Sequence, residues 1–347
     1  MIEDADPEGF SPACMLFQGA HAHPSHQVFA DSIGADYRHF ETGRLPDGDR
    51  NQDVNSELER VRTARSLSDH YEIVVAEGTA PIQTAMAYRL LGNWDTNVLY
   101  LAADETFYAL ESLSSTLLWN ALKPLTARLL DGVVAVGQDV YDWSKPYLGE
   151  RPVEVVHPPI DDDKYELLSD LSPNSPDEEF LLLSAGTTKP TNNYDKLAAA
   201  TEELVDRGLP VQTVVLGADH PNEPYSDLDA VSTPGFVDLS EFRSYFERAS
   251  VYVQPSVGDS FPVAALEGIL SATPTLVTSG VGVRELLPDS QVVAPTIEGL
   301  VDGIEAHYAM PAAERRELGA AQRSLVENLT VANQSKLFRQ AVINLTA

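Results

Sequence analysis

The chain has 347 residues, of which 53 are acidic and 23 are basic, so its formal net charge at pH 7 is −30. A negative charge of this size argues against nucleic acid or an anionic membrane as an electrostatic partner, because both would be repelled. Hydrophobic residues make up 43% of the chain and the acids are scattered along it. The composition therefore predicts a folded protein and excludes a disordered acidic polypeptide.

The basic residues are 17 arginines and only 6 lysines. A dispersed acidic surface with little lysine is typical of halophilic proteins, since molar salt shortens the reach of self-repulsion to about 3 Å. An ordinary acidic cytosolic protein is the alternative interpretation. The charge pattern thus predicts an acidic surface suited to high salt.

A single cysteine, Cys14, leaves no pair for an internal disulfide. The acidic N-terminus does not resemble a signal peptide. No apolar stretch approaches the roughly 20 residues that span a bilayer. We therefore expect a cytoplasmic protein.

Short apolar runs alternate with helical stretches along almost the whole chain. Strands separated by helices of about ten or more residues indicate parallel sheets that are covered on both faces. We divide the chain into a first domain of residues 1–166, a linker rich in Ser, Pro and acid at 167–179, a second domain at 180–332 and a final helical segment at 333–347. The predicted strands are Cys14–Gln18, Tyr71–Ala76, Asn97–Ala102, Gly132–Val136 and Val153–His157 in the first domain, and Phe180–Ser184, Gln212–Leu216, Thr233–Val237, Ser250–Gln254, Thr275–Thr278 and Val292–Ala294 in the second.

The segment Ser250–Glu285 is the most informative part of the chain. It predicts a strand, a tight loop, a mostly apolar helix, a second strand and a second loop. Asp259 or Ser260 is expected to cap the helix, with Pro262 in its first turn. The free amides at such a helix start favour a phosphate, and Glu267, eight residues after Asp259, is a lone carboxylate that a ligand hydroxyl could satisfy.

This segment resembles the donor-binding segment of retaining GT-B glycosyltransferases, specifically glycosyltransferase family 4. That family carries a Glu-x7-Glu motif between a Pro-Ser pair and a Gly-x-Pro turn, followed by a Gly-Gly-x-x-Glu loop. Asp stands here in place of the first Glu, and Ala in place of the Gly of the turn. The matching positions are Pro255, Ser256, Asp259, Ser260, Phe261, Pro262, Glu267, Gly268, Ala272, Pro274, Gly282 and Glu285.

The first half resembles the family more weakly, through the order and spacing of four strands. Residues 71–77 and 98–104 match two family strands, and the second of these ends at Asp104. Residues 130–138 and 153–161 match two further strands, the last of which closes the N-terminal domain. The resemblance thus covers nearly the whole chain. It implies a GT-B fold of two Rossmann-like domains with parallel sheets facing across a cleft, and a last helix, Asn333 to about Ile343, that returns to the first domain.

The function that the resemblance implies is transfer of a sugar from a nucleotide-diphosphate sugar to an acceptor hydroxyl or lipid phosphate. It implies retention of configuration and no metal or other cofactor. No nucleophile or general base is assigned, because the resemblance implies that the leaving phosphate itself acts as the base. Glu267 would accept hydrogen bonds from the ribose and Asp259 would face the donor sugar. The further donor residues would be Ser260, Phe261 and Pro262 at the sugar and diphosphate, Gly186, Thr187, Lys189 and Asn192 at the diphosphate, and Gly235 and Phe236 near the base.

On the acceptor side the resemblance implies Gly19 and Asp104 in the cleft, with His21 meeting the sugar or the acceptor. Two donor positions depart from the family: Thr187 stands where Arg is expected and Asn192 where Lys is expected. Charges and dipoles held ready around a leaving group usually contribute more to catalysis than any other single effect. A degenerate, weakly active or inactive glycosyltransferase-like partner protein therefore remains the alternative.

Three weaker motifs have two interpretations each. His21, His23 and His26 suggest either a metal-dependent hydrolase or side chains that line the cleft. Residues 161–163 are three aspartates, either a metal motif or a capped turn. An Arg-rich stretch, residues 38–65, is neutral overall because six acids match its arginines; it suggests either a salt-bridged surface or a weak peripheral contact with a lipid or polyanionic acceptor.

Overall fold

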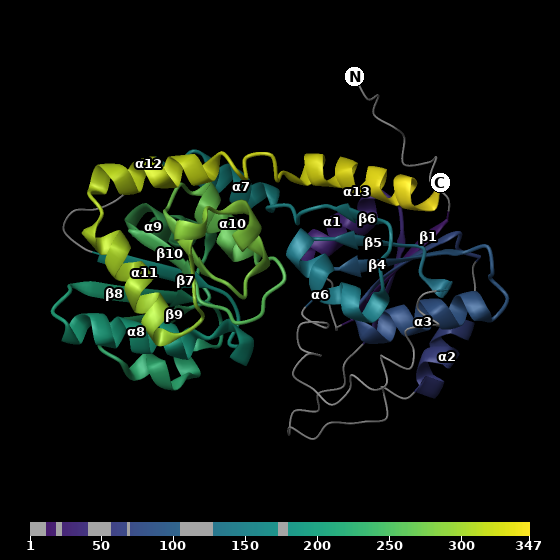
Figure 1. The fold of residues 1–347 in the computed structure, drawn as a ribbon, viewed down its shortest axis with the longest axis horizontal. Helices are drawn as coiled ribbons and strands as arrows, with labels where there is room; N and C mark the ends of the chain where they lie inside the picture. The colour runs from purple at the N-terminus through teal and green to yellow at the C-terminus, as the bar shows by residue number, and fades with distance from the viewer. Residues whose placement is uncertain (1–11, 19–22, 41–56, 68–69, 105–127, 173–179) are drawn as a thin grey trace. The chain divides into compact units, whose positions relative to one another are not determined.

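The computed structural model describes residues 12–18, 23–40, 57–67, 70–104, 128–172 and 180–347. The chain divides into two compact units (Figure 1). Unit 1 comprises Met1–Pro159 and Val331–Ala347, and unit 2 comprises Ile160–Thr330.

Unit 1 is built on a six-stranded parallel sheet with the strand order β2-β1-β3-β4-β5-β6. Helices α1 and α13 pack together on one face of this sheet, and α2 and α3 pack together on the other (Figure 1). The described elements are β1 (Ala13–Gln18), α1 (Pro24–Ser32), β2 (Asp36–Phe40), α2 (Glu57–Ser66), β3 (Ile73–Glu77), α3 (Thr79–Leu90), β4 (Asn97–Ala102), β5 (Gly132–Ala135), α6 (Gln138–Leu148), β6 (Val153–Val155) and α13 (Val331–Thr346).

The core of unit 1 includes the C-terminal helix. Phe338 of α13 stacks on Phe29 of α1 with ring centroids 4.6 Å apart, and both rings are fully buried. Gly132 at the start of β5 leaves room for Leu345, since an added Cβ would lie 2.8 Å from that side chain. Residues 331–347 therefore complete the N-terminal unit although they end the sequence.

Unit 2 also has a six-stranded parallel sheet, in the order β12-β11-β10-β7-β8-β9. Helices α8 and α11 cover one face, and α9 and α10 cover the other (Figure 1). The elements are α7 (Asp162–Ser169), β7 (Phe180–Ala185), η3 (Pro190–Asn192), α8 (Tyr194–Asp206), β8 (Val211–Leu216), η4 (His220–Asn222), η5 (Pro224–Asp227), β9 (Val231–Gly235), α9 (Leu239–Arg248), β10 (Val251–Gln254), α10 (Val263–Leu270), β11 (Thr275–Thr278), η6 (Gly282–Leu286), η7 (Asp289–Gln291), β12 (Val292–Val293), α11 (Ile297–Ala309) and α12 (Ala312–Arg323).

The predicted fold class, α/β with two Rossmann-like parallel sheets, is confirmed. One strand was not predicted: β2 lies at the edge of its sheet, and its sequence, residues 36–40, lacks the continuous apolar run of the central strands. Residues 160–166, which the sequence places in the first domain, lie in unit 2, where α7 contacts α9 and α10. Helix α7 also extends to residue 169 and so into the expected linker.

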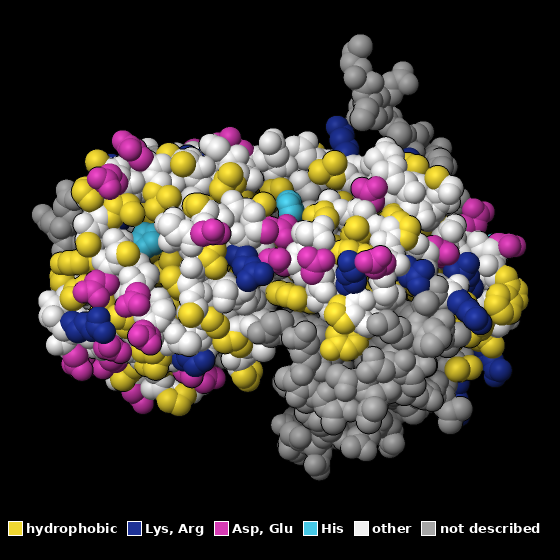
Figure 2. All heavy atoms as spheres, viewed as in Figure 1, with side chains coloured by type: hydrophobic (Ala, Val, Ile, Leu, Met, Phe, Trp, Pro, Cys, Tyr) yellow, Lys and Arg dark blue, Asp and Glu magenta, His cyan; other side chains and the backbone are white. Residues whose placement is uncertain are grey.

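None of the described helices has both the length and the apolar character needed to cross a membrane. On the face shown in Figure 2, Asp and Glu side chains are scattered over the described surface of each unit and are not gathered in one block.

Candidate functional site

The strand order of unit 2 selects one edge of its sheet as a ligand site. Chain connections run to opposite sides of the central pair β7 and β10, and in open parallel sheets ligands bind beyond the carboxyl ends of the strands at such a switch point. Gly186 follows β7 and Pro255 follows β10. The loops after these two strands contain most of the predicted donor residues.

The loop after β7 is held tightly at Gly186. Its φ is +155°, and a Cβ added there would collide with the hydroxyl of Tyr194. Its amide donates to Leu216 O (3.0 Å), and its carbonyl lies 3.0 Å from His220 Nε2. Because a carbonyl only accepts, His220 carries its proton on Nε2, and Nδ1 accepts from the hydroxyl of Tyr225 (2.5 Å). Burial lowers the pKa of His220, which favours this neutral form.

The side chains of Thr187 and Asn192, the two positions that differ from the family, point in opposite directions in this loop. Thr187 is exposed, as is Lys189 two residues on. Asn192 is 6% exposed and donates from Nδ2 to Thr187 O (2.7 Å), with Thr187 Oγ1 at 3.3 Å. The side chain that replaces the expected lysine is thus turned into the loop, where it fixes the backbone of the residue that replaces the expected arginine.

The loop after β10 is braced by the loop after β11. Asp259 pairs with Val281 as an isolated parallel bridge: its amide donates to Gly280 O (3.1 Å), and its carbonyl accepts from the Gly282 amide (2.9 Å). The predicted helix cap at Asp259 or Ser260 is wrong. Helix α10 begins at Val263 with Pro262 as its N-cap, because the backbone of Asp259 is committed to the bridge.

Ser260 and Phe261 are buried in this loop, with exposed fractions of 3% and 6%. Pro262, partly buried, is extended at φ −64° and ψ 117°. No described side chain caps the first turn of α10, where the Ala265 amide donates to Pro262 O (3.1 Å); a helix start of this kind favours an anion.

Glu267 lies on the inner face of α10 and is 2% exposed. The helix can approach β10 closely because Gly268 lies against the ring of Tyr252, where an added Cβ would come within 2.6 Å of Cγ. Burial raises the pKa of the Tyr252 hydroxyl. Electrostatic interactions with Tyr194, Glu267 and Asp259 add to that rise. Both acids of the predicted motif thus act electrostatically on one buried tyrosine.

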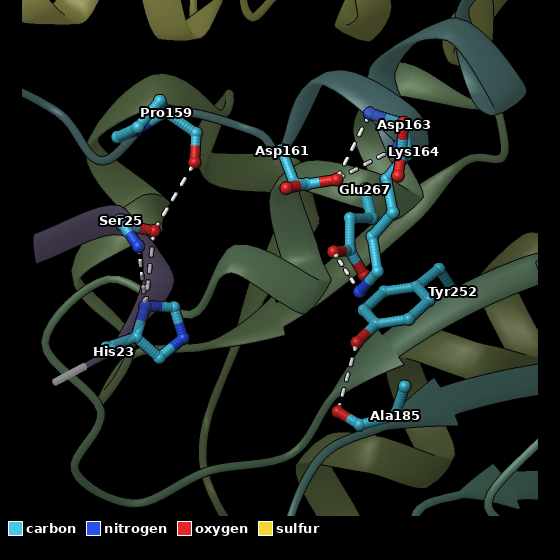
Figure 3. Close-up of polar contacts among 9 residues, drawn as sticks. All are labelled: His23, Ser25, Pro159, Asp161, Asp163, Lys164, Ala185, Tyr252 and Glu267. Atoms are coloured by element: carbon cyan, nitrogen blue, oxygen red, sulfur yellow. Dashed lines mark hydrogen bonds and ion pairs between the residues drawn. The ribbon is translucent and has the colours of Figure 1, made fainter. Parts of the chain in front are cut away.

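Lys164 of α7 is the partner of Glu267, and the sequence did not indicate it. Its Nζ lies 2.6 Å from Glu267 Oε1 (Figure 3) and 5.0 Å from the ring centroid of Phe242. Burial raises the pKa of the Glu267 carboxyl, and the Lys164 ammonium opposes that rise. The Lys164 side chain is 35% exposed and the Glu267 side chain 3%, so the lysine is the member of the pair that faces solvent.

Helix α7 is placed for this contact by its N-cap. Asp161 accepts from the amides of Asp163 (3.1 Å) and Lys164 (3.4 Å) (Figure 3). Of the two interpretations of the three aspartates, a capped turn describes Asp161. Lys164 is one turn further on, and 103 residues separate it from Glu267, so no local sequence signal could have paired them.

The predicted base-contacting residues lie at the end of β9. The strand ends at Gly235, whose φ is +84°, two residues before the predicted end. Phe236 follows it and is 87% exposed. A large aromatic ring in solvent beside the strand ends is available to stack on a ligand.

In unit 1, Gly19 and His21 lie outside the described residues. Asp104 accepts a hydrogen bond from the Tyr100 hydroxyl (3.0 Å). His23 caps α1 through Nδ1, which accepts from the Ser25 amide (3.3 Å). His26 Nδ1 lies 2.7 Å from Glu77 Oε2. No three His, Cys, Asp or Glu side chains in the described part of the chain are placed to hold a metal ion.

A family model matches part of the chain. Residues 179–309 match the family model described as Glycosyl transferases group 1. No curated protein sequence is detectably similar to the chain.

Similar solved structures cover almost the entire chain. Sucrose-phosphate synthase from Thermosynechococcus elongatus is 14% identical with a TM-score of 0.71, over 96% of this chain and 100% of that one. HepE from Anabaena, solved with UDP and glucose, is 13% identical with a TM-score of 0.70, over 96% and 100%. The UDP-forming α,α-trehalose-phosphate synthase from Burkholderia xenovorans is 12% identical with a TM-score of 0.71, over 97% and 100%.

At these identities the likeness establishes the fold. The two parallel six-stranded units and the whole-chain similarity together show that this protein has the GT-B glycosyltransferase fold, and its residues 179–309 match the group 1 glycosyl transferases.

Proposed function

We propose that the protein transfers a sugar from a nucleotide-diphosphate sugar to an acceptor, with retention of configuration and without a metal. The observation that carries the proposal is the buried carboxylate of Glu267. It lies on α10, the helix that follows strand β10 of the switch point, inside the segment that matches the glycosyl transferase model. The similar Anabaena protein was solved with UDP and glucose, which supports a nucleotide sugar as the donor.

Each part of the nucleotide-sugar donor (ribose, sugar, diphosphate and base) has a proposed partner in unit 2. Glu267 accepts hydrogen bonds from the ribose hydroxyls, and Asp259 faces the sugar. The first-turn amides of α10 and the exposed Lys189 stabilise the diphosphate, whose charge grows as the glycosidic bond breaks. Phe236 stacks on the base. The acceptor oxygen bonds to the anomeric carbon on the face from which the diphosphate leaves, and its proton passes to the departing phosphate.

The test is release of nucleoside diphosphate from UDP-, GDP- and ADP-sugars in chelator, with proton NMR of the product to read its anomeric configuration. Glu267→Gln keeps the size of the side chain and removes its charge, so nucleotide affinity should fall by roughly tenfold or more, the loss of about one charge-assisted hydrogen bond. Glu317→Gln, an exposed acid of α12, is the matched control. Equal affinity in the two variants would refute the donor site.

A binding protein with little or no turnover is the second candidate, favoured by the inward orientation of Asn192. Lysine in place of Asn192 would break the hydrogen bond to Thr187 O. Thr187→Arg adds a cation at an exposed position and leaves that contact with the backbone in place. We expect Thr187→Arg to raise affinity for a nucleoside diphosphate and leave affinity for the nucleoside unchanged. If the unaltered protein and Thr187→Arg both bind nucleotide but release no sugar from the nucleotide sugar, the second candidate is favoured.

A further inference from the structure

Unit 2 has a second pocket, which we call the Tyr225 pocket, and its described lining includes none of the predicted donor residues. It has a volume of about 470 Å³ and lies between the first two turns of α8 and the short helix η5. Pockets that hold small molecules commonly have volumes of roughly 300–1,000 Å³. Asp195, Glu223 and Tyr225 supply its polar groups, and Ala198 and Leu228 contribute to its apolar walls.

Two carboxylates make this pocket negative. Asp195 is exposed and Glu223 is half-buried, and the described lining of the pocket includes no lysine, arginine or histidine. Burial raises the pKa of the Tyr225 hydroxyl, and the charges of Glu223 and Asp195 add to that rise, so both acids act on one point. An anion would therefore be repelled from the pocket, whereas a cation would be attracted to it.

The other walls favour an organic cation over a metal ion. The ring of Tyr225 packs against the buried core of unit 2, and an aromatic face attracts an ammonium group. Ala198 and Leu228 offer apolar surface to the carbon atoms of such a ligand. A bare divalent ion needs more oxygen ligands than two carboxylates supply, and the described residues contain no group of three acids, histidines or cysteines placed to bind one.

The Tyr225 pocket is connected to the predicted donor loop after β7. The Tyr225 hydroxyl donates to His220 Nδ1 (2.5 Å), and His220 Nε2 donates to Gly186 O (3.0 Å). Tyr194, the neighbour of Asp195 in α8, packs edge-on against the His220 ring with centroids 4.7 Å apart, and its hydroxyl lies against Gly186. Pocket residues thus lead to this loop by two routes, one through each of its supporting rings.

We propose that the Tyr225 pocket binds a small organic cation, a substituted ammonium on an apolar body, and that its occupation strengthens nucleotide binding at the loop after β7. The coupling rests on the proposed donor site, whereas binding of the cation does not. A cation seated against Tyr225 restrains the ring whose hydroxyl fixes His220, and so restrains the loop at Gly186. Because such coupling is reciprocal, a bound nucleotide strengthens cation binding by the same factor.

The first experiment measures which ligand the pocket takes. The probes are choline and 3,3-dimethylbutan-1-ol, its uncharged carbon isostere, titrated against the full chain by saturation-transfer NMR at constant ionic strength. We expect choline to bind about tenfold more tightly, since two ion pairs and a cation–π contact each contribute a few-fold. Asp195→Asn with Glu223→Gln should remove this preference. Glu314→Gln with Glu317→Gln, two exposed acids of α12, removes the same charge elsewhere and should preserve it.

The second experiment measures the coupling by calorimetry with UDP, GDP and ADP. Saturating choline should raise affinity for the nucleotide that binds by about fivefold or more, whereas the carbon isostere should not. Tyr225→Phe keeps the ring and removes the hydroxyl that reaches His220. This variant should still bind choline within about twofold of the unaltered protein, but choline should no longer change its nucleotide affinity.

The proposed ligand is refuted if choline binds no better than its isostere, or if the pocket variant and the α12 variant lose the preference equally. The first comparison uses the unaltered protein, so it holds even if a variant fails to fold. Nucleotide affinity that does not respond to choline would refute the coupling. A preference for choline in a protein that binds no nucleotide would refute the donor site and the coupling, and would support the assignment of the pocket.

Discussion

At the scale of single residues, the site depends on how a buried carboxylate is kept charged. Glu267 is almost fully buried, and an isolated charge there would be costly to hold away from water. The ammonium of Lys164 offsets that cost at 2.6 Å. The lysine is thus a positioning residue: its charge favours the ionised form of Glu267, the form that our proposal needs for hydrogen bonds from a ribose.

Replacing Lys164 with methionine should therefore shift the pH dependence of nucleotide binding. Burial already raises the pKa of Glu267, so affinity should fall as the pH drops toward a value above the ordinary 4.5. Lys164→Met removes the opposing charge and raises that pKa further, so the fall should begin at a higher pH. Lys164→Arg keeps the charge and should restore the original profile. Calorimetric titrations from pH 5 to 8 check this, and superimposable profiles for all three proteins would contradict it.

At the scale of elements, the C-terminal helix is a structural part of unit 1. Phe338→Ala should lower the free energy of unfolding by about 3–5 kcal/mol, because it removes a fully buried ring stacked on Phe29. Its neighbour Leu337 is 52% exposed, so Leu337→Ala should change stability by no more than about 0.5 kcal/mol. Urea denaturation of the two variants measures the difference. Equal losses would mean that α13 does not contribute to the core.

The loop after β7 depends on a second glycine, Gly217, at the end of β8. A Cβ at Gly217 would collide with Gly186 O and approach the His220 ring to 2.7 Å. Gly208 also has a positive φ but has nothing within 4 Å, so Gly208→Ala costs only the backbone strain. We expect Gly217→Ala to destabilise the protein by about 1–3 kcal/mol more than Gly208→Ala, the usual cost of overpacking.

Nucleotide binding distinguishes the two glycine variants further. The loop that holds Gly186, Thr187 and Lys189 moves only in Gly217→Ala, so this variant alone should lose affinity for a nucleoside diphosphate. Calorimetry on both variants is the measurement. Equal affinity would mean that the Gly217 contact does not set the conformation of the loop.

At the scale of the whole molecule, the net charge of −30 dominates. Like charges spread over the surface repel one another. As the salt concentration rises, screening limits this repulsion to shorter distances. We expect the melting temperature to increase steeply as KCl goes from about 0.1 M to 2 M. An equal concentration of an uncharged osmolyte serves as the control. A melting temperature that does not respond to KCl would remove the proposal that the surface is adapted to high salt.

The sequence alone determined the local parts of this protein. Apolar runs such as residues 180–184 match the pattern of central strands in a parallel sheet, and the alternation of short strand-like runs with helical stretches predicted eleven of the described strands. The predicted donor residues follow strand ends, because parallel strands direct their ligand-binding loops to one edge. Strand β2 escaped prediction because its sequence, residues 36–40, contains no apolar run, which an edge strand does not require.

The tertiary structure decided which distant groups meet. Lys164 reaches Glu267 across 103 positions, and Glu77 lies beside His26 only because β3 pairs with β1. Helix α10 begins at Val263, later than the sequence predicted, because the backbone of Asp259 pairs with Val281. Propensity acts between neighbours along the chain, whereas the cost of burying a charge is met by whichever partner the packing brings near.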